Sequence, residues 1–479
     1  MPHSFLSNFL LFAASVCLSG LHAADQPNFL FLLSDDQSWN GLSCQMHPDI
    51  PGSASRIVET PHIASLATEG MRFSAAYSPA PVCSPTRISL QTGKSPAQLH
   101  WTKAAPTMGG SDGFKLIAPA ISKSIPEEEI TIGEILQRAG YATALYGKWH
   151  LNGGGPDYHG YDESDGETSN GSAAPFVEPN PVDIFGMGER AVDFMEKSKS
   201  AGKPFFITCY YHALHYPQNA TRALVEKYKG KLPNGNDKEI GRSAISEDLD
   251  RGVGELLENL DRLGLRENTY VIYMSDNGGG VRGLMKGGKG DVWEAGIRVP
   301  LIVRGPGIEA NSWCHERVVG YDFFNTFCEL GQVKENIPKG VEGGSITHLF
   351  RGESGPVSRP FEELVFHFPH YQGDSPHTAI YLGDYKLIRH YEDGSLNLFN
   401  IAEDIGESRN LASQMPDRAE QMEGLMDAYL ETVDAQLPTP NPDYDPDNPP
   451  SIKGANDAKR GGKGKGGKGK GKGGKKPRS

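Results

Sequence analysis

One short run places a cysteine and an arginine at a spacing suited to binding an anion. It reads C-S-P-T-R from Cys83 to Arg87. Ser84 is a favourable helix N-cap, Pro85 fits the first helical position and Gly93 is a typical helix stop, so we expect a short helix here. Residues four apart share one helix face, and the free N–H groups at a helix N-terminus attract negative charge. Cys83 and Arg87 would then face a tetrahedral oxyanion, whereas the alternative is a structural or disulfide-bonded cysteine.

Hard oxygen donors follow two apolar runs of strand length. Asp35 and Asp36 come directly after the first run, near the start of the chain. Asp276 and Asn277 come after the second run, at residues 269–274. In open α/β sheets ligands bind beyond the carboxyl ends of the strands, so these groups are expected at one site. Carboxylate and amide oxygens without a thiol or histidine cluster suit Ca²⁺ or Mg²⁺, and flexible ligation of this kind favours Ca²⁺.

Several cationic or titratable side chains also follow expected strands. Lys148 and His150 lie in G-K-W-H, where a spacing of two places both on one side of an extended segment. His212 and His215 lie in Y-H-A-L-H-Y-P, and Lys289 lies in the glycine-rich run G-G-K-G. Each residue alone is more often a surface lysine or a hydrogen-bonded histidine. Together they would surround an anion with positive charge.

Alternating helices and buried strands indicate the fold that must position these groups. Continuous apolar runs predict strands at 27–33, 142–146, 204–210, 269–274 and 299–303. Helical periodicity predicts helices at 189–197 and 246–263. We therefore expect an α/β fold with a mostly parallel sheet between helices.

The predicted secondary structure changes at about residue 353. Short strands separated by turns are expected at 364–368, 378–382, 385–389 and 397–399, followed by a helix at 417–433. This pattern predicts a smaller antiparallel subdomain at 353–437, after a main domain at 25–352. Residues 438–479 are expected to form a proline-rich exit and a disordered Gly/Lys tail.

The two ends of the chain predict export and contact with polyanions. Residues 1–24 resemble a signal peptide, so we expect a secreted or periplasmic protein. The net charge is −13, but residues 453–479 hold nine lysines, two arginines and one aspartate, a net charge of +10, which leaves −23 for the rest. The tail is either a tether to a polyanion or cell surface, or a solvated tail without a specific partner. An exported chain without a folded basic domain is not expected to bind nucleic acid.

The sequence does not determine which cysteines form disulfides. Without Cys17 of the expected signal peptide, five cysteines remain, an odd number in a compartment that permits disulfides. If Cys83 has another fate, Cys44, Cys209, Cys314 and Cys328 could pair in several ways, or Cys209 could be a buried apolar residue.

Taken together, the motifs resemble the type I sulfatase family, of the arylsulfatase A kind, and in particular its exported bacterial carbohydrate sulfatases. The resemblance runs from Asn28 to about residue 445. It is carried, in the family's order, by F-L-L-S-D-D-Q, C-S-P-T-R, G-K-W-H-L, H-Y-P, E-D-L-D-R, S-D-N-G-G and G-G-K-G-D-V-W-E-A-G-I-R-V-P. It implies an alkaline-phosphatase-like core with a small C-terminal antiparallel subdomain.

The resemblance also implies roles for individual residues. Cys83 would be oxidised to Cα-formylglycine by a formylglycine-generating enzyme and would be held in place by Arg87. His150 would hydrogen-bond the hydrated aldehyde. The ligands of one Ca²⁺ would be Asp35, Asp36, Asp276, Asn277 and the modified Cys83. The groups that bind sulfate would be Lys148, His215 and Lys289.

The substrate is less well defined by the sequence. We expect a sulfated polysaccharide or oligosaccharide, with His212, His370, Tyr371 and Arg389 as candidate substrate-binding residues. Two alternatives remain, namely a phosphomonoester or phosphonate hydrolase on the same fold, and a polysaccharide-binding protein without catalysis. The complete set of expected ligands and cations disfavours the second, and the absence of a second metal cluster in the sequence disfavours the first.

Overall fold

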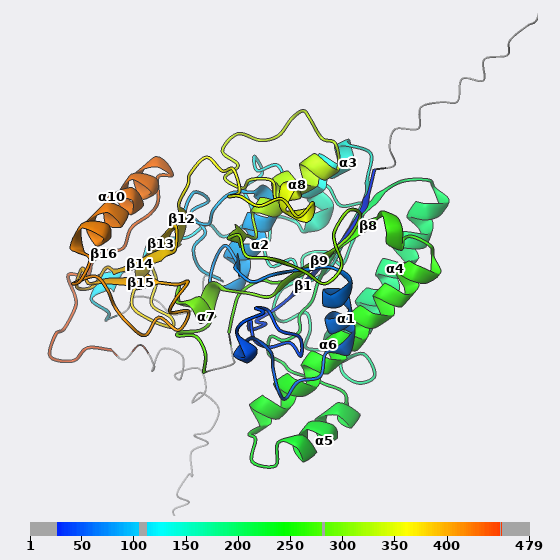
Figure 1. Cartoon of the computed structure of the whole chain (residues 1–479), viewed down its shortest axis with the longest axis horizontal. Coiled ribbons are helices and arrows are strands. Elements are labelled where there is room, and N and C mark those ends of the chain that lie inside the picture. The colour runs from blue at the N-terminus through cyan, green and yellow to red at the C-terminus, as the bar shows by residue number, and fades with distance from the viewer. Residues whose placement is uncertain (1–25, 105–112, 280–282, 451, 453–479) are drawn as a thin grey trace, which may run out of the picture.

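The computed structural model describes residues 26–104, 113–279, 283–450 and 452 (Figure 1). The expected signal peptide and nearly all of the basic tail lie outside these residues. No helix in the described part of the chain has both the length and the apolar character needed to cross a bilayer.

A mixed eight-stranded sheet forms the centre of the molecule. From one edge to the other, its strands are β10 (Ser312–Cys314), β2 (Met71–Phe73), β9 (Leu301–Arg304), β8 (Thr269–Ser275), β1 (Asn28–Ser34), β7 (Phe205–Tyr210), β5 (Ala142–Gly147) and β6 (Glu163–Ser164). Strands β8, β1, β7, β5 and β6 run parallel, whereas β9 is antiparallel to both β8 and β2. The prediction of a mostly parallel sheet is therefore confirmed.

Helices cover both faces of this sheet (Figure 1). One face packs against α1 (Pro61–Glu69), α4 (Ile184–Ser200) and α6 (Asp237–Arg262), with α5 (Arg222–Lys231) outside α6. The other packs against α2 (Cys83–Thr92), α3 (Ile132–Arg138), α8 (Asp322–Leu330) and α9 (Thr347–Phe350). Strand β1 shows why its run is continuously apolar. Phe29, Phe31 and Leu33 face the α2 side, and Leu30 and Leu32 face the α6 side.

The structure corrects the bounds of several predicted elements. Helix α6 begins at Asp237, nine residues before the predicted start, because Asn236 caps it: the Asn236 side chain accepts from the backbone of Lys238 and Glu239. The first turns of α6 place only Ile240 and Ala244 against α5, an apolar stripe too short for periodicity alone to reveal the start of the helix. Strand β9 begins at Leu301, after Pro300, rather than at residue 299.

A second, four-stranded antiparallel sheet follows, as predicted. Its strands are β12 (Leu364–Phe368), β13 (His377–Leu382), β14 (Tyr385–His390) and β15 (Leu396–Asn400), and α10 (Pro416–Thr432) packs on one face. The other face packs against the main part of the molecule, including the short helix α7 (Glu294–Ile297). Two short pairs complete the fold: β3 (Ala76–Tyr77) with β11 (Val318–Val319), and β4 (Leu116–Ile117) with β16 (Thr439–Pro440).

A buried charge network fastens the second sheet to α7. Lys386 of β14 donates to Glu294 of α7 at 3.1 Å and to Glu407 at 2.7 Å, and Arg298 donates to Glu294 at 2.6 Å. The side chains of Lys386, Glu294 and Glu407 are fully buried. Because α7 begins five residues after Lys289, this network ties the C-terminal sheet to a segment expected at the site.

We expect Lys386→Met to destabilise the protein by about 3–5 kcal/mol, since it leaves the buried carboxylate of Glu407 without its cation. Urea denaturation followed by circular dichroism would measure the loss. The exposed Lys229 provides a matched control, and Lys229→Met should leave the midpoint unchanged. Adding Glu407→Gln to Lys386→Met should restore part of the stability. A double variant no more stable than the single one would contradict this account.

Candidate active site

Helix α2 presents Cys83 at its first turn. The helix begins at Cys83 itself, with the extended Val82 as N-cap, so the prediction that Ser84 caps it was wrong. Val82 already has the extended conformation that precedes a helix, and the chain turns helical two residues earlier than the cap preference of serine suggested. The predicted end is confirmed, because Gly93 has a left-handed conformation, with φ of 70°. Cys83 and Arg87 are both buried and lie one turn apart.

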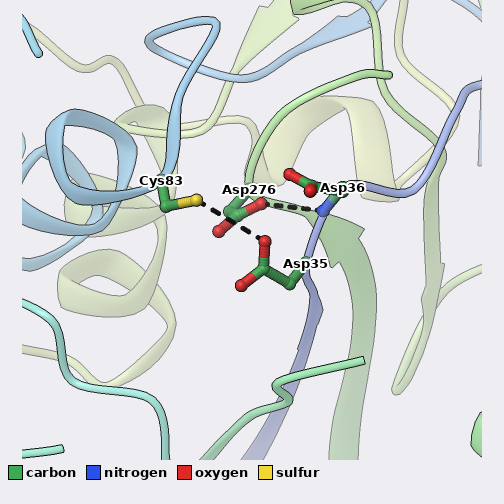
Figure 2. Close-up of side chains that lie close together, drawn as sticks. All are labelled: Asp35, Asp36, Cys83 and Asp276. Carbon is green, nitrogen blue, oxygen red and sulfur yellow. Dashed lines mark hydrogen bonds between the residues drawn. The ribbon is translucent and has the colours of Figure 1, made fainter. Parts of the chain in front are cut away.

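The ends of β1 and β8 bring the predicted acidic residues to Cys83. The two strands are paired in parallel up to Ser34 and Ser275, so the residues that follow lie side by side. Each of Asp35, Asp36, Asp276 and Cys83 offers one ligand atom, and these atoms all lie within 4.8 Å of one another (Figure 2). We call these four residues the acidic cluster. Among the described residues, no other group of three or more His, Cys, Asp or Glu converges in this way.

Local backbone geometry allows neighbouring aspartates to point into one cluster. In a regular strand the side chains of Asp35 and Asp36 would point to opposite faces. The strand has ended at this point, however, and Asp36 has a left-handed conformation with φ of 61°. Such a conformation costs a non-glycine residue free energy and is typical of functional sites.

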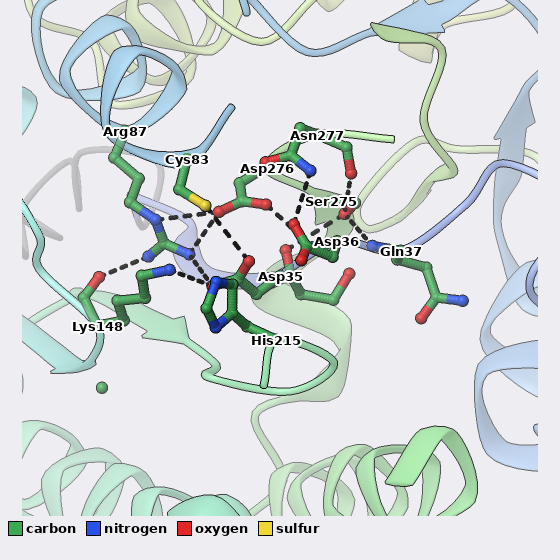
Figure 3. A network of polar contacts seen from close by, with 12 residues as sticks. Asp35, Asp36, Gln37, Cys83, Arg87, Lys148, His215, Ser275, Asp276 and Asn277 are labelled. Carbon is green, nitrogen blue, oxygen red and sulfur yellow. Dashed lines mark hydrogen bonds and ion pairs between the residues drawn. The ribbon is translucent and has the colours of Figure 1, made fainter. Parts of the chain in front are cut away.

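Three buried or partly buried cations balance the three carboxylates, and two of them, Arg87 and Lys148, are labelled in Figure 3. Arg87 donates to Asp276 Oδ2 through Nη2 at 2.7 Å and through Nε at 3.1 Å. Lys148 Nζ donates to Asp35 Oδ2. Lys289 Nζ donates to Asp36 Oδ1 at 2.5 Å and lies 3.2 Å from Cys83 Sγ.

The turn after β5 explains how Lys148 reaches the acidic cluster. Gly147 has φ of 91°, and a Cβ at this position would collide with the carbonyl oxygen of Tyr210 on β7. Only glycine allows the chain to turn so close to the neighbouring strand. The predicted gathering of Lys148 and Lys289 with the acidic residues is thus present in the structure.

The surroundings set the protonation states of the acidic cluster. Burial alone would raise the pKa of Asp35, but Lys148 and the other nearby cations outweigh burial and hold this pKa well below its usual range. Burial, followed by the charges of Asp276 and Asp35, raises the pKa of the Cys83 thiol to about 12. A thiol at Cys83 is therefore protonated at neutral pH and is a weak nucleophile.

Asn277 indicates that the acidic cluster fits a metal ion. Its Nδ2 donates to Asp36 Oδ1 at 2.8 Å, whereas its Oδ1 is buried and has no hydrogen-bond partner among the described residues. A buried acceptor without a partner is costly unless a ligand satisfies it. Three carboxylates and this amide oxygen form an oxygen-rich donor set of the kind that hard divalent cations prefer.

The predicted histidines border the acidic cluster. His150 adopts φ of 60°, and its Nδ1 is buried without a partner among the described residues. Burial, followed by the charge of Lys148, lowers the pKa of His150 to about 2 and that of His212 to about 3. Burial also lowers the pKa of His215, whose Nδ1 donates to the carbonyl of Tyr216 at 2.6 Å. All three rings are therefore neutral at neutral pH, because burial disfavours their charged form.

Two of the candidate substrate-binding residues lie near the Lys289 loop. The backbone N–H of Gly373 donates to the carbonyl of Gly290, which places the segment after Tyr371 beside Lys289. The His370 ring is 2.8 Å from Thr102 Oγ1, and the Tyr371 ring stacks on Phe114 with 4.1 Å between centroids.

Arg389, by contrast, lies against α10. It donates to Asp427 at 2.6 Å and to Glu423 at 3.5 Å, and within the described residues it makes no contact with the acidic cluster. All four candidates, His212 included, stay predictions as substrate-binding residues.

All five cysteines in the described part of the chain are unpaired. Cys209 is fully buried on β7 and acts there as an apolar residue, one of the readings that its sequence context left open.

Sequence reasoning missed two residues that support the site. Arg242 of α6 donates through Nη1 to the backbone carbonyl of Asp36 at 2.9 Å. Both carboxylate oxygens of Asp291 accept from the N–H of Gly288, next to Lys289, at 3.0 and 3.1 Å. No sequence signal marked Arg242, because it is one polar residue on a long amphipathic helix. Asp291 lies within the run G-G-K-G-D-V-W, but the geometry of the loop, rather than the motif, sets its hydrogen-bond partner.

Known proteins resemble the chain along most of its length. The family model described as Sulfatase matches residues 27–333, and the model described as N-sulphoglucosamine sulphohydrolase, C-terminal, matches residues 288–436. The chain is 29% identical to arylsulfatase A of Homo sapiens over 417 residues, which cover 77% of this chain and 76% of that protein. It is 27% identical to an ulvan-active sulfatase of Formosa agariphila over 482 residues, covering 91% and 87% of the two chains.

A solved structure shares the fold. The crystal structure of Ps i-CgsB in complex with k-i-k-neocarrahexaose superposes with a TM-score of 0.72 and 23% sequence identity. The match covers 90% of this chain and 97% of that chain.

We expect a divalent cation to stabilise the protein through the acidic cluster. At a Ca²⁺ concentration about 100 times its dissociation constant, the stability gain should be about 2.7 kcal/mol. The gain is measured as the rise in Tm when Ca²⁺ is added to protein that a chelator has first stripped of metal. Asp36→Asn removes one anionic ligand and should reduce the rise, whereas Asp49→Asn, at an exposed position, should not. An equal rise in the Asp36→Asn variant would locate the ion elsewhere.

Proposed function

The chain belongs to the sulfatase family, whose members hydrolyse sulfate esters, and we propose that it desulfates carbohydrates with a Cα-formylglycine made from Cys83 and one Ca²⁺. The observation that supports this most directly is the convergence of Cys83, three carboxylates and three cations at the first turn of α2. Such an arrangement suits a nucleophile that must approach an anion.

The state of Cys83 supports its conversion. With a pKa of about 12, the thiol would attack a sulfate ester poorly. The hydrate of an aldehyde at this position instead carries two hydroxyl groups on one carbon, one to attack sulfur and one to allow sulfate to leave. Because Cys83 is only 1% exposed in the folded protein, we propose that a formylglycine-generating enzyme modifies it during maturation.

The metal ligands would be Asp35, Asp36, Asp276, Asn277 and the modified residue 83. The buried, unpartnered Oδ1 of Asn277 supports this set. When bound, Ca²⁺ would supply positive charge that acidifies the attacking hydroxyl and stabilises the sulfuryl oxygens.

The remaining residues would bind the ester and move protons. Lys148 and Lys289 would stabilise charge on the sulfuryl oxygens, and Arg87 would hold residue 83 through its position on the same helix face. As the bond between sulfur and the ester oxygen breaks, His215 would donate a proton to the departing alcohol, and the proton that the attacking hydroxyl gives up would leave to water. His150 would take the proton of the second hydroxyl as the bond between carbon and the sulfate oxygen breaks, which releases sulfate and restores the aldehyde.

The low pKa of His150 agrees with a base that is neutral before the reaction. Burial makes the imidazolium form of His215 costly in the free protein, and the negative charge of a bound sulfate ester would offset that cost.

A carbohydrate substrate is supported by the relatives and by the charge of the chain. One relative is described as ulvan-active, and a protein of the same fold has been crystallised with a neocarrahexaose. We propose an exported enzyme, secreted or periplasmic, that acts on sulfated polysaccharides or oligosaccharides. Its basic tail would contact polyanions or a cell surface. The subdomain at 353–437 and His212, His370, Tyr371 and Arg389 would contribute to substrate recognition.

We expect the purified enzyme to hydrolyse an aryl sulfate far faster than the matching aryl phosphate. The intact mass of the peptide that contains Cys83 should be that of the aldehyde or its hydrate rather than the thiol. Cys83→Ala has no heteroatom on Cβ from which the aldehyde could be made, and it should lose activity by at least about 10³-fold. Faster turnover of the phosphate, or active enzyme with an unmodified thiol, would refute the proposal.

The two histidines should respond differently to the leaving group. If His215 protonates the departing oxygen, His215→Ala should lose about 10²–10⁴-fold on esters of weakly acidic alcohols and much less on esters of acidic phenols. His150→Ala acts after the alcohol has left, so its loss should be the same across the series. Measuring kcat/KM over aryl sulfates of graded phenol pKa tests both roles. The opposite pattern would mean that the two histidines have each other's roles.

A further inference from the structure

A cavity of about 760 Å³ lies beside the acidic cluster. Its wall includes Gln37, which follows Asp36, and Leu214, which precedes His215. The opposite wall comes from the end of α5, the connection to α6 and the first turns of α6. This volume is within the range of small-molecule sites, and the chain neighbours of Asp36 and His215 form part of its wall.

The wall of the cavity combines apolar and polar groups. Val58, Leu232 and Pro233 provide apolar surface, and Gln37 and Asn234 provide amides. A sugar ring has apolar C–H faces and hydroxyl groups at its edge, so a wall of this composition can contact both.

Positive charge predominates around the cavity. Lys231, Lys238 and Arg242 line it, against the single carboxylate of Glu239. Glu239 already accepts from the backbone of Asn236 at 3.0 Å, in the cap of α6. Lys231 is likewise engaged, through an ion pair with a glutamate outside the cavity.

Arg242 differs from Lys231 because it makes no direct ion pair, although the charges of Asp36 and Asp35 partly offset the burial that lowers its pKa. Within the described part of the chain, no carboxylate oxygen lies within ion-pairing distance of its guanidinium. Its one hydrogen bond joins Nη1 to the carbonyl of Asp36 at 2.9 Å, and its Nε is buried without a partner among the described residues. Burial still disfavours this cation more than the two aspartates favour it, so an anionic ligand at the unpartnered side of the guanidinium would stabilise it.

We propose that this cavity binds the sugar next to the one that is desulfated, and that Arg242 binds an anionic group on that neighbouring sugar. This inference rests on the sulfatase function proposed above. Asp36 provides the geometric link, because its carboxylate belongs to the acidic cluster while its carbonyl accepts from Arg242. A glycan with one sulfate ester at Cys83 extends past Asp36 into the cavity.

The guanidinium fork suits either a sulfate or a carboxylate, since both present two oxygens to parallel N–H donors. The enzyme thus selects glycans that carry an anion on adjacent sugars, and Arg242 is a specificity-determining residue.

The test measures calorimetric binding of four-sugar probes to the full chain loaded with Ca²⁺. The probes are a κ-carrageenan tetrasaccharide with sulfates only, a hyaluronan tetrasaccharide with carboxylates only, and neutral maltotetraose. Arg242→Gln should weaken binding of at least one charged probe by about tenfold or more and should not change that of maltotetraose. Arg242→Lys keeps the charge but not the fork, so its loss should be smaller. The charged probe affected identifies the anion that is recognised.

Arg222→Gln is the matched control, because this arginine of α5 is 93% exposed and does not line the cavity. It should bind all probes as the wild-type protein does. Kinetics on an aryl sulfate, which is too small to fill both sites, provide the second readout. The loss in kcat/KM that Arg242→Gln causes on the aryl sulfate should be at least about tenfold smaller than its loss on a charged tetrasaccharide.

Equal losses on the aryl sulfate and the tetrasaccharide would overturn the proposal, since Arg242 would then only support Asp36. Failure of both charged probes to bind the wild-type protein would also overturn it. Binding that depends on Arg242, in a protein that turns over no sulfate ester, would instead contradict the proposed function and leave the anion site in place.

Discussion

The structure depends on the balance of charge around three carboxylates held in a buried space. Asp35, Asp36 and Asp276 have ligand atoms within 4.8 Å of one another and of Cys83. Like charges this close repel strongly where water is excluded. Arg87, Lys148 and Lys289 make the arrangement possible by bringing one cation to each carboxylate. The same balance of charge would let the site take up a divalent cation and an anionic ester together.

The fold supplies this balance from elements far apart in the chain. The parallel ends of β1 and β8 provide the carboxylates, the first helical turn of α2 provides Cys83 and Arg87, and the turn after β5 provides Lys148. Lys289 comes from a loop that is fixed on both sides. Asp291 binds the backbone of that loop, and the Glu294 network attaches the following helix to the C-terminal sheet. The second sheet therefore contributes to the site by fixing a loop as well as by its position.

Much of this could be predicted from residue types and spacing. The continuous apolar run before Asp35 identified a central strand, and its alternate residues do pack on both faces of the sheet. The meander of the second sheet followed from short alternating runs and glycine turns. Predictions were less accurate where polar residues or single caps set the bounds, as at the start of α6 and at Cys83 itself. At those positions backbone geometry and capping outweigh hydrophobic periodicity, which is the main signal that a sequence carries.

The sequence alone determined which groups are available for chemistry, because strand ends, glycine turns and the C-S-P-T-R run are local features. Only the tertiary structure decided which of them meet. It paired each carboxylate with a particular cation, left Asn277 Oδ1 without a partner, and turned Arg389 toward α10. It also placed Arg242 between Asp36 and a cavity, although 206 positions separate the two residues in the chain. Contacts of this kind depend on how helices pack across a sheet, and a long amphipathic helix does not reveal from its sequence which of its polar residues faces a site.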